Sequence, residues 1–197
     1  EDADLLDVRY NVIQWVHRST RGWSYGSSVS DPRTGEIIKG HVSLGSLRIR
    51  QDFLIAQALQ APYASDDTSD QFALEMALAR IRQLSAHEVG HTIGLAHNFA
   101  ASSKGRSSVM DYPHPTLSLN NGEVDFTDAY DTKIGDWDKV SIAYSYSEFK
   151  TDEDANLKSI LNDAFNNGAR FITDQDARPL GSAHAYAHLW DNGSDVS

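Results

Sequence analysis

The chain contains no cysteine, so disulfides and thiol-based catalytic or metal sites are excluded. Lysine and arginine are also few: 17 of them stand against 28 aspartates and glutamates, and the formal net charge is −11. Because phosphate binding needs clustered basic side chains, no nucleic-acid partner is expected. No apolar run reaches the roughly 18 residues of a transmembrane helix, and the first residues do not have the pattern of a signal peptide.

The most informative segment is HEVGHTIGLAH, at residues 87–97. Residues four apart lie on the same face of an α-helix, so His87 and His91 can bind one ion. A catalytic zinc takes three protein ligands and leaves the fourth position to water, so a third ligand is needed. His97 can supply it only if the helix ends first. Gly94 predicts this end, because glycine enters the left-handed conformation without steric cost.

Glu88 follows the first histidine of this segment directly. It points about 100° away from the histidine pair, and so lies beside a bound ion rather than on it. Zinc lowers the pKa of its water to about 7, and a neighbouring carboxylate can accept that proton while the water attacks a polarised carbonyl. Peptide hydrolysis is the reaction that this arrangement favours. Structural histidines, or a structural zinc with four protein ligands, are the weaker alternatives.

The spacing HExxHxxGxxH matches the zinc-binding and catalytic signature of the metzincin peptidases. The later segment SVMDY, residues 108–112, resembles their Met-turn. This resemblance implies that Met110 forms an apolar floor beneath the metal-binding imidazoles without binding zinc. It also implies that Tyr112, as in the astacin-like and serralysin-like branches, is a displaceable zinc ligand that donates a hydrogen bond to the oxyanion. An ordinary core methionine and a packing tyrosine are the alternatives.

Residues 7–146 most resemble a bacterial family called met-zincin, found within large zinc-dependent metalloproteases of the cell envelope or exterior. The two motifs and the run SVSDPRTGEI, residues 28–37, carry this resemblance. It implies one catalytic Zn²⁺, an extended polypeptide substrate, and a secreted, periplasmic or cell-envelope location. It also implies further domains in a longer parent chain. Residues 169–197 contain no usable motif.

Several segments have the composition of strands. Residues 8–17 would place apolar side chains on both faces of an extended strand, which predicts a central strand covered on both sides. Residues 23–29 and 36–44 flank the turn sequence DPRTG and predict a hairpin. The alternation of residues 47–50 also predicts a strand. By resemblance, an edge strand before the active-site helix pairs with the substrate, and residues 41–45 are our candidate for it. An ordinary strand of the hairpin is the equally weighted alternative.

Four segments are predicted to be helical. Residues 52–60 predict a short helix, and a long run of helix formers covers residues 68–94. Residues 136–144 place their apolar side chains on one helical face. Residues 151–167 carry a clearer apolar stripe, and Gly168 predicts where that helix stops.

Other groups of metal-ligating side chains give weaker signals. Six carboxylates crowd one segment without EF-hand spacing, so a solvated acidic loop is favoured over a calcium site. They are Glu123, Asp125, Asp128, Asp131, Asp136 and Asp138. His184 and His188 stand four apart without a glutamate or a third histidine around them, and His114 follows the Met-turn segment. We interpret all three histidines as surface or rim residues rather than ligands.

These predictions combine into an α/β (α+β) zincin-like fold of one domain or two subdomains. A small twisted mixed sheet and the active-site helix form an upper subdomain, residues 1–97. The Met-turn and further helices form a mostly helical lower subdomain, residues 98–197, with the zinc cleft between. Metzincins usually carry a strand and a long helix before their second strand, whereas here only residues 18–22 separate the first two strand candidates, so residues 8–17 correspond to the second strand of that fold. We therefore expect the chain to begin partway through the upper subdomain of a longer protein.

The function that the sequence favours is a zinc endopeptidase with Glu88 as its general base. A catalytically silent binding module on the same scaffold is an alternative, and the retained Glu88 speaks against it. A zinc hydrolase of a non-peptide amide or ester is a third hypothesis, because the same metal and base can attack such a substrate. Only a panel of substrates separates it from the first.

Overall fold

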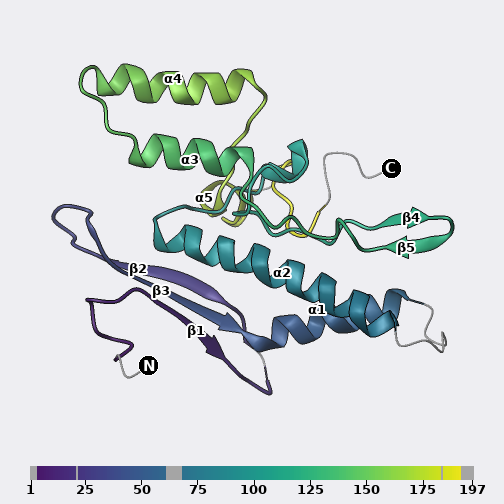
Figure 1. The fold of residues 1–197 in the computed structure, drawn as a ribbon. Helices are drawn as coiled ribbons and strands as arrows, with labels where there is room; N and C mark the ends of the chain where they lie inside the picture. The colour runs from purple at the N-terminus through teal and green to yellow at the C-terminus, as the bar shows by residue number, and fades with distance from the viewer. Residues whose placement is uncertain (1–3, 21, 61–67, 183, 192–197) are drawn as a thin grey trace. The chain divides into compact units, whose positions relative to one another are not determined.

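The computed structural model describes residues 4–20, 22–60, 68–182 and 184–191 (Figure 1). It is a mixed α/β structure with a small mixed sheet and several helices, which confirms the predicted fold class. The chain divides into two compact units. The first consists of Glu1–Gly94 and Pro115–Thr132, and the second of Leu95–His114 and Lys133–Ser197. Residues 115–132, which the sequence analysis grouped with the C-terminal half, thus belong to the first unit.

The first unit contains a three-stranded sheet made of β1 (Val12–Val16), β2 (Tyr25–Ser30) and β3 (Ile37–Gly45). The strand order is β1-β3-β2, with β1 parallel and β2 antiparallel to β3. The hairpin predicted from the DPRTG turn is therefore confirmed as β2–β3. The hairpin joins β2 and β3 directly, whereas the parallel strands β1 and β3 are separated in the chain by β2.

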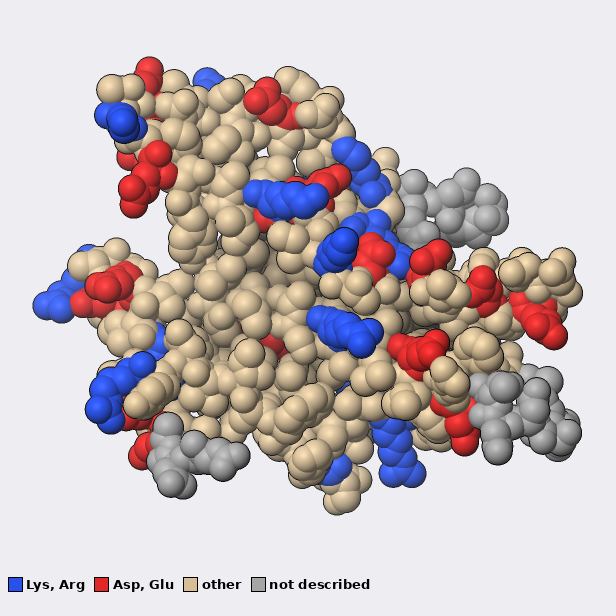
Figure 2. All heavy atoms as spheres, viewed as in Figure 1, with Lys and Arg blue, Asp and Glu red and all other residues tan. Residues whose placement is uncertain are grey.

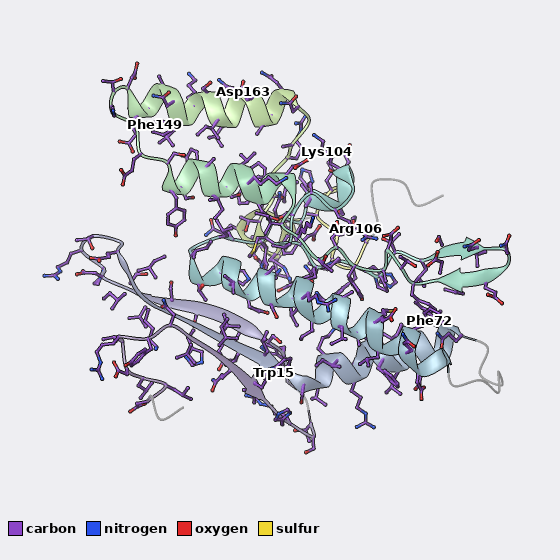
Figure 3. The ribbon with its side chains drawn as sticks, viewed as in Figure 1. Trp15, Phe72, Lys104, Arg106, Phe149 and Asp163 are labelled. Carbon is purple, nitrogen blue, oxygen red and sulfur yellow. The ribbon has the colours of Figure 1, made fainter. Side chains whose placement is uncertain are left out.

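The prediction of a central strand at residues 8–17 is wrong. Within the described sheet β1 lies at an edge, and Ile13 and Trp15 keep 64% and 49% of their surface exposed. Figure 3 shows Trp15 on this strand. Apolar side chains in both phases favour a strand, but the position of a strand in its sheet depends on long-range pairing that composition does not encode.

The prediction that residues 41–45 pair with substrate is also wrong. This stretch belongs to β3, the middle strand, and both of its edges are occupied. On one side His41 pairs with Val12, and on the other side it pairs with Ser27. Because the backbone of this stretch is already paired with β1 on one side and β2 on the other, a substrate strand cannot pair with it.

Residues 47–50 form the start of a helix, not a strand. Helix α1 (Ser46–Leu59) begins directly after Gly45 and contains most of the short helix predicted at 52–60. A segment as short as this one fits both the helical and the strand periodicity, and tertiary packing decides which structure forms. Here α1 packs against the next helix, and Ala56 on its buried side joins the core of the first unit.

Helix α2 (Thr68–Thr92) is the longest helix of the structure and confirms the helix predicted over residues 68–94. It packs on strands β2 and β3 and on α1 (Figure 1). Ala73 and Met76 of α2 meet Phe126 and Tyr130 in the same buried cluster as Ala56. The short hairpin of β4 (Ser118–Asn120) and β5 (Glu123–Asp125) precedes those two aromatic residues.

The second unit is helical apart from its loops. It contains the 3₁₀ turn η1 (Ala101–Lys104), α3 (Asp136–Tyr146), α4 (Glu153–Asn166) and the short α5 (Asp174–Ala177). Helices α3 and α4, which pack together, confirm the two helices predicted there. Gly168 has φ +85° directly after α4, as expected of its stop signal. Helix α5 lies within residues 169–197, which contain no usable sequence motif.

Charged side chains of both signs are interspersed over the face shown in Figure 2. Among the described residues, no helix combines the length and the apolar character needed to cross a bilayer.

Candidate metal centre

His87 and His91 lie on one face of α2, as their spacing predicts. Their Nε2 atoms are 3.1 Å apart, and the two rings meet edge to face. Two nitrogens bound to one tetrahedral zinc at about 2.0–2.1 Å would lie about 3.3 Å from each other. The observed separation therefore fits two ligands of a single zinc ion, and His87 is buried with only 3% of its surface exposed.

The chain leaves the helix at Gly94, also as predicted. Gly94 has φ +89°, and its N–H donates a hydrogen bond to the carbonyl of His91 at 3.1 Å, so the last turn is tightened. A Cβ atom at Gly94 would meet no heavy atom within 4 Å. Backbone conformation, not lack of space, is therefore what requires glycine at this turn.

The turn brings His97 to the histidine pair. The ligand atoms of His87, His91 and His97 all lie within 4.8 Å of one another. Across the described parts of the chain, this is the one group of three or more His, Cys, Asp or Glu side chains placed to hold a metal ion. Three imidazoles are a ligand set that zinc accepts while one coordination position stays open. The donor set thus fits a catalytic zinc better than a closed structural site.

Glu88, which directly follows His87 on α2, is buried, with 4% of its surface exposed. Burial raises the pKa of its carboxyl to about 7, although a hydrogen bond from the Gly26 backbone and the charge of Arg80 both act to lower it. Strand β2 approaches α2 very closely here, since a Cβ atom at Gly26 would lie 1.9 Å from the Glu88 carbonyl oxygen. A carboxyl whose pKa lies near neutrality is suited to accept and return a proton.

Met110 is almost fully buried in the second unit, with 1% of its surface exposed. Its N–H donates to the Ser108 hydroxyl oxygen at 3.0 Å, and its carbonyl accepts a hydrogen bond from the Asn98 N–H at 3.1 Å. The Met110 segment is therefore tied directly to the residue that follows His97.

Asp138 supports the same segment from α3. Its carboxylate accepts hydrogen bonds from the Ser108 hydroxyl at 2.6 Å, the Val109 N–H at 2.9 Å and the Gly135 N–H at 2.6 Å. Only 2% of Asp138 is exposed. The prediction that it belongs to a solvated acidic loop is wrong, because this buried carboxylate accepts from three donors, two of which, from Ser108 and Val109, are buried as well.

Tyr112 lies in a row of aromatic rings. Its ring centroid is 4.8 Å from that of His97 and 5.9 Å from that of Phe99. On Trp190 it is stacked at 5.4 Å, with the ring planes inclined by 14°. The phenol ring is therefore in contact with one of the three clustered histidines.

Asp174 is a site residue that sequence reasoning missed. Its Oδ2 lies 2.5 Å from His97 Nδ1, and the Arg178 Nε is 3.2 Å from its other oxygen. The capping-box spacing of Thr173 and Asp176 could have indicated α5, but no local signal connects residues that are 77 positions apart.

The remaining candidate histidines lie at the surface, as predicted. His114, His184 and His188 are exposed, and among the described residues none of them belongs to the three-histidine group that could hold a metal ion. His184 Nδ1 accepts a hydrogen bond from the Tyr186 N–H at 3.2 Å, which gives this ring a local structural contact.

Comparison with known proteins agrees with this geometry. A family model described as Met-zincin matches residues 69–197, from the first turn of α2 through the segment that lacked any motif. Residues 7–68, part of the resemblance stated above, lie outside that match. No curated protein matches the chain, and no solved structure does. The matched residues include all three clustered histidines and make up more than half of the chain, which therefore belongs to the Met-zincin family, with a zinc-dependent, peptidase-like domain.

Proposed function

We propose that this domain is a zinc endopeptidase in which His87, His91 and His97 bind a single catalytic zinc ion. The observation that carries the proposal is the convergence of the ligand atoms of these three imidazoles within 4.8 Å, with Glu88 directly following the first of them in the chain. A structural site would be expected to use four protein ligands, often cysteines, and this chain has no cysteine.

His87, His91 and His97 would hold the zinc ion, which would supply Lewis-acid activation of water and of the substrate carbonyl when bound. Glu88 acts as the general base that takes a proton from the attacking water, and it then donates a proton to the leaving amine. Burial supports this role, because a pKa of about 7 lets one carboxyl both accept and release a proton near neutral pH.

Two residues of the 108–112 segment complete the proposed site. The hydroxyl of Tyr112 donates a hydrogen bond to the oxyanion that forms when water attacks the carbonyl. Met110 provides an apolar floor for the metal-binding imidazoles without binding zinc. The burial of Met110 and the contact between the Tyr112 and His97 rings support these assignments.

The substrate we propose is an extended polypeptide that pairs with β2. The outer edge of β2 pairs with no described strand, and Gly26 of this strand donates its backbone hydrogen bond to Glu88. A peptide strand added to that edge would therefore run close to the general base. We further propose that the domain works in a secreted, periplasmic or cell-envelope protein with additional domains.

The decisive variant is Glu88→Gln, measured for zinc content and for cleavage of a denatured protein mixture with the cut sites mapped by mass spectrometry. We expect full zinc occupancy and a loss of at least ~10²–10⁴ in turnover, the contribution of a general base. Glu75→Gln, an exposed position on the same helix, is the matched control and should leave both quantities unchanged.

Retained peptidase activity in the Glu88 variant would overturn the assignment of the base. Stoichiometric zinc in the unaltered protein without cleavage of any unfolded protein would overturn the peptidase proposal in favour of a binding module. Cleavage confined to non-peptide amides or esters in a substrate panel would instead establish the third hypothesis.

A further inference from the structure

His97, the third proposed zinc ligand, makes a polar contact with Asp174 through the Nδ1 atom of its ring. The Nδ1 atom lies 2.5 Å from Oδ2 of Asp174, and His97 has 16% of its side-chain surface exposed. An ionised carboxylate can only accept hydrogen bonds, so His97 must carry its proton on Nδ1 in this contact. In a neutral imidazole Nε2 is then the unprotonated nitrogen, and an unprotonated ring nitrogen is the one that binds a metal.

The carboxylate of Asp174 is itself held in place from the other side. Arg178, one helical turn later, brings its Nε to 3.2 Å from Oδ1 of Asp174 and donates its backbone N–H to the Asp174 carbonyl at 2.9 Å. Its guanidinium also lies over the ring of Phe99, 5.5 Å from the centroid. Arg178 therefore connects Asp174 to the segment that directly follows His97.

Backbone and side-chain hydrogen bonds fasten the two segments together. The Phe99 N–H donates to the Ile172 carbonyl at 2.8 Å. The side chain of Asn98, which is fully buried, accepts from the Ile172 N–H at 3.2 Å and donates to the Arg170 carbonyl at 2.9 Å. The approach to α5 is thus tied to residues 98 and 99, so Asp174 has a defined position relative to His97.

We propose that Asp174 is a positioning residue for the third zinc ligand, with Arg178 orienting its carboxylate. The hydrogen bond from His97 fixes the tautomer and the ring orientation before the metal binds, so less ordering is required on binding. Such carboxylate partners of metal-binding histidines typically contribute 10–100-fold to metal affinity or activity. The catalytic meaning of this inference rests on the proposed function, whereas its effect on zinc binding does not.

The test measures the zinc dissociation constant by competition with a chromophoric chelator. Asp174→Ala should weaken zinc binding by about 10–100-fold, and Asp174→Glu should recover part of that loss. The matched control is Asp176→Ala, on the same short helix. Asp176 accepts a hydrogen bond from the Thr173 N–H at 3.2 Å, so its removal loosens α5 without touching His97.

A second readout is the tautomer of His97 in the metal-free protein, observed in long-range ¹H–¹⁵N spectra. We expect the Nδ1–H form in the unaltered protein and a mixture of tautomers in Asp174→Ala. The inference is overturned if Asp174→Ala binds zinc as tightly as the unaltered protein. It is also overturned if Asp176→Ala weakens zinc binding equally, since the effect would then belong to the helix and not to the carboxylate.

Peptidase activity at saturating zinc, measured on the same proteins, separates the two proposals. An unaltered protein that binds zinc but cleaves no peptide would end the peptidase proposal and leave the affinity comparison valid. An active protein whose Asp174 variants keep full zinc affinity would end this inference alone.

Discussion

The indole of Trp190 is stacked on the phenol of Tyr112, and the backbone N–H of Trp190 donates a hydrogen bond to the backbone carbonyl of Tyr112 at 3.0 Å. Trp190 adopts φ +63°, a conformation that a bulky residue rarely takes. The contact therefore comes at some conformational cost. A residue near the end of the chain thus holds the ring that contacts His97.

The first prediction concerns this stack. Tyr112→Phe should lower kcat by about 10²-fold or more, the cost of removing an oxyanion donor. Trp190→Ala should lower kcat by roughly tenfold, because the phenol loses its orientation but keeps its hydroxyl. Trp190→Phe keeps an aromatic neighbour and should retain most activity. In steady-state kinetics of the double variant, Trp190→Ala should add little to Tyr112→Phe, since both act through one hydroxyl. Fully additive losses would contradict a positioning role.

The second prediction concerns Gly94. Gly94→Ala forces a Cβ atom into the left-handed region and should reduce the free energy of unfolding by about 1–2 kcal/mol. It should also weaken zinc binding, because the turn at φ +89° is what directs His97 back towards the helix. Urea unfolding and chelator competition measure the two effects.

Gly168→Ala is the control for that variant. Gly168 has φ +85° at the end of α4 and a new Cβ atom would meet only ordinary contacts. It should cost a similar free energy of unfolding and leave zinc affinity unchanged. Equal loss of zinc affinity in both glycine variants would show that the geometry at residue 94 has no special role.

The third prediction concerns the pH dependence of the metal-free protein. Burial raises the pKa of Glu88 from 4.5 to about 7 in the folded state. Between these values the folded state binds more protons than the unfolded state, so the free energy of unfolding falls as the pH rises. At 1.36 kcal/mol for each pKa unit, the loss by pH 8 is at most about 3 kcal/mol.

Glu88→Gln should remove this dependence, because a neutral amide carries no burial penalty for charge. Urea unfolding at pH 5 and pH 8, with a chelator present, should show the variant gaining stability over the unaltered protein mainly at pH 8. A parallel pH dependence in the two proteins would show that Glu88 is not the group responsible.

The fourth prediction concerns Asp138. Removing its carboxylate leaves three donors, from Ser108, Val109 and Gly135, without their buried acceptor. Asp138→Ala should therefore lower the free energy of unfolding by about 2–4 kcal/mol. Asp136→Ala, two residues earlier on α3, removes a carboxylate whose side chain is 91% exposed and should change stability by less than about 0.5 kcal/mol. Chemical unfolding of both variants checks this, and equal losses would contradict the buried role of Asp138.

Features that depend on residues close together in the chain could be predicted from the sequence. The pairing of His87 with His91 follows from helix periodicity, and the exit at Gly94 follows from the steric freedom of glycine. The hairpin around the DPRTG turn and the two helices of the second unit follow in the same way. In each case the decisive interactions span about four residues or a single turn.

Predictions failed where the outcome depends on distant neighbours. Residues 8–17 have the composition of a central strand, yet β1 lies at an edge of the described sheet. Residues 41–45 occupy the middle strand because β1 pairs with them from far upstream. Residues 47–50 are helical because α1 packs on α2. Strand order and helix packing are set by the whole fold, so alternation within one segment cannot reveal them.

The three clustered histidines and Glu88 could therefore be identified from the linear sequence, because one helix and one glycine turn determine the local arrangement of residues 87–97. The groups that support them were not. Asp174 reaches His97, Asp138 reaches Ser108, and Gly26 reaches Glu88 only after separate elements have packed together. A hydrogen bond across such a distance leaves no periodic trace in the sequence, because it depends on where two surfaces meet and not on the spacing of side chains along one helix or strand.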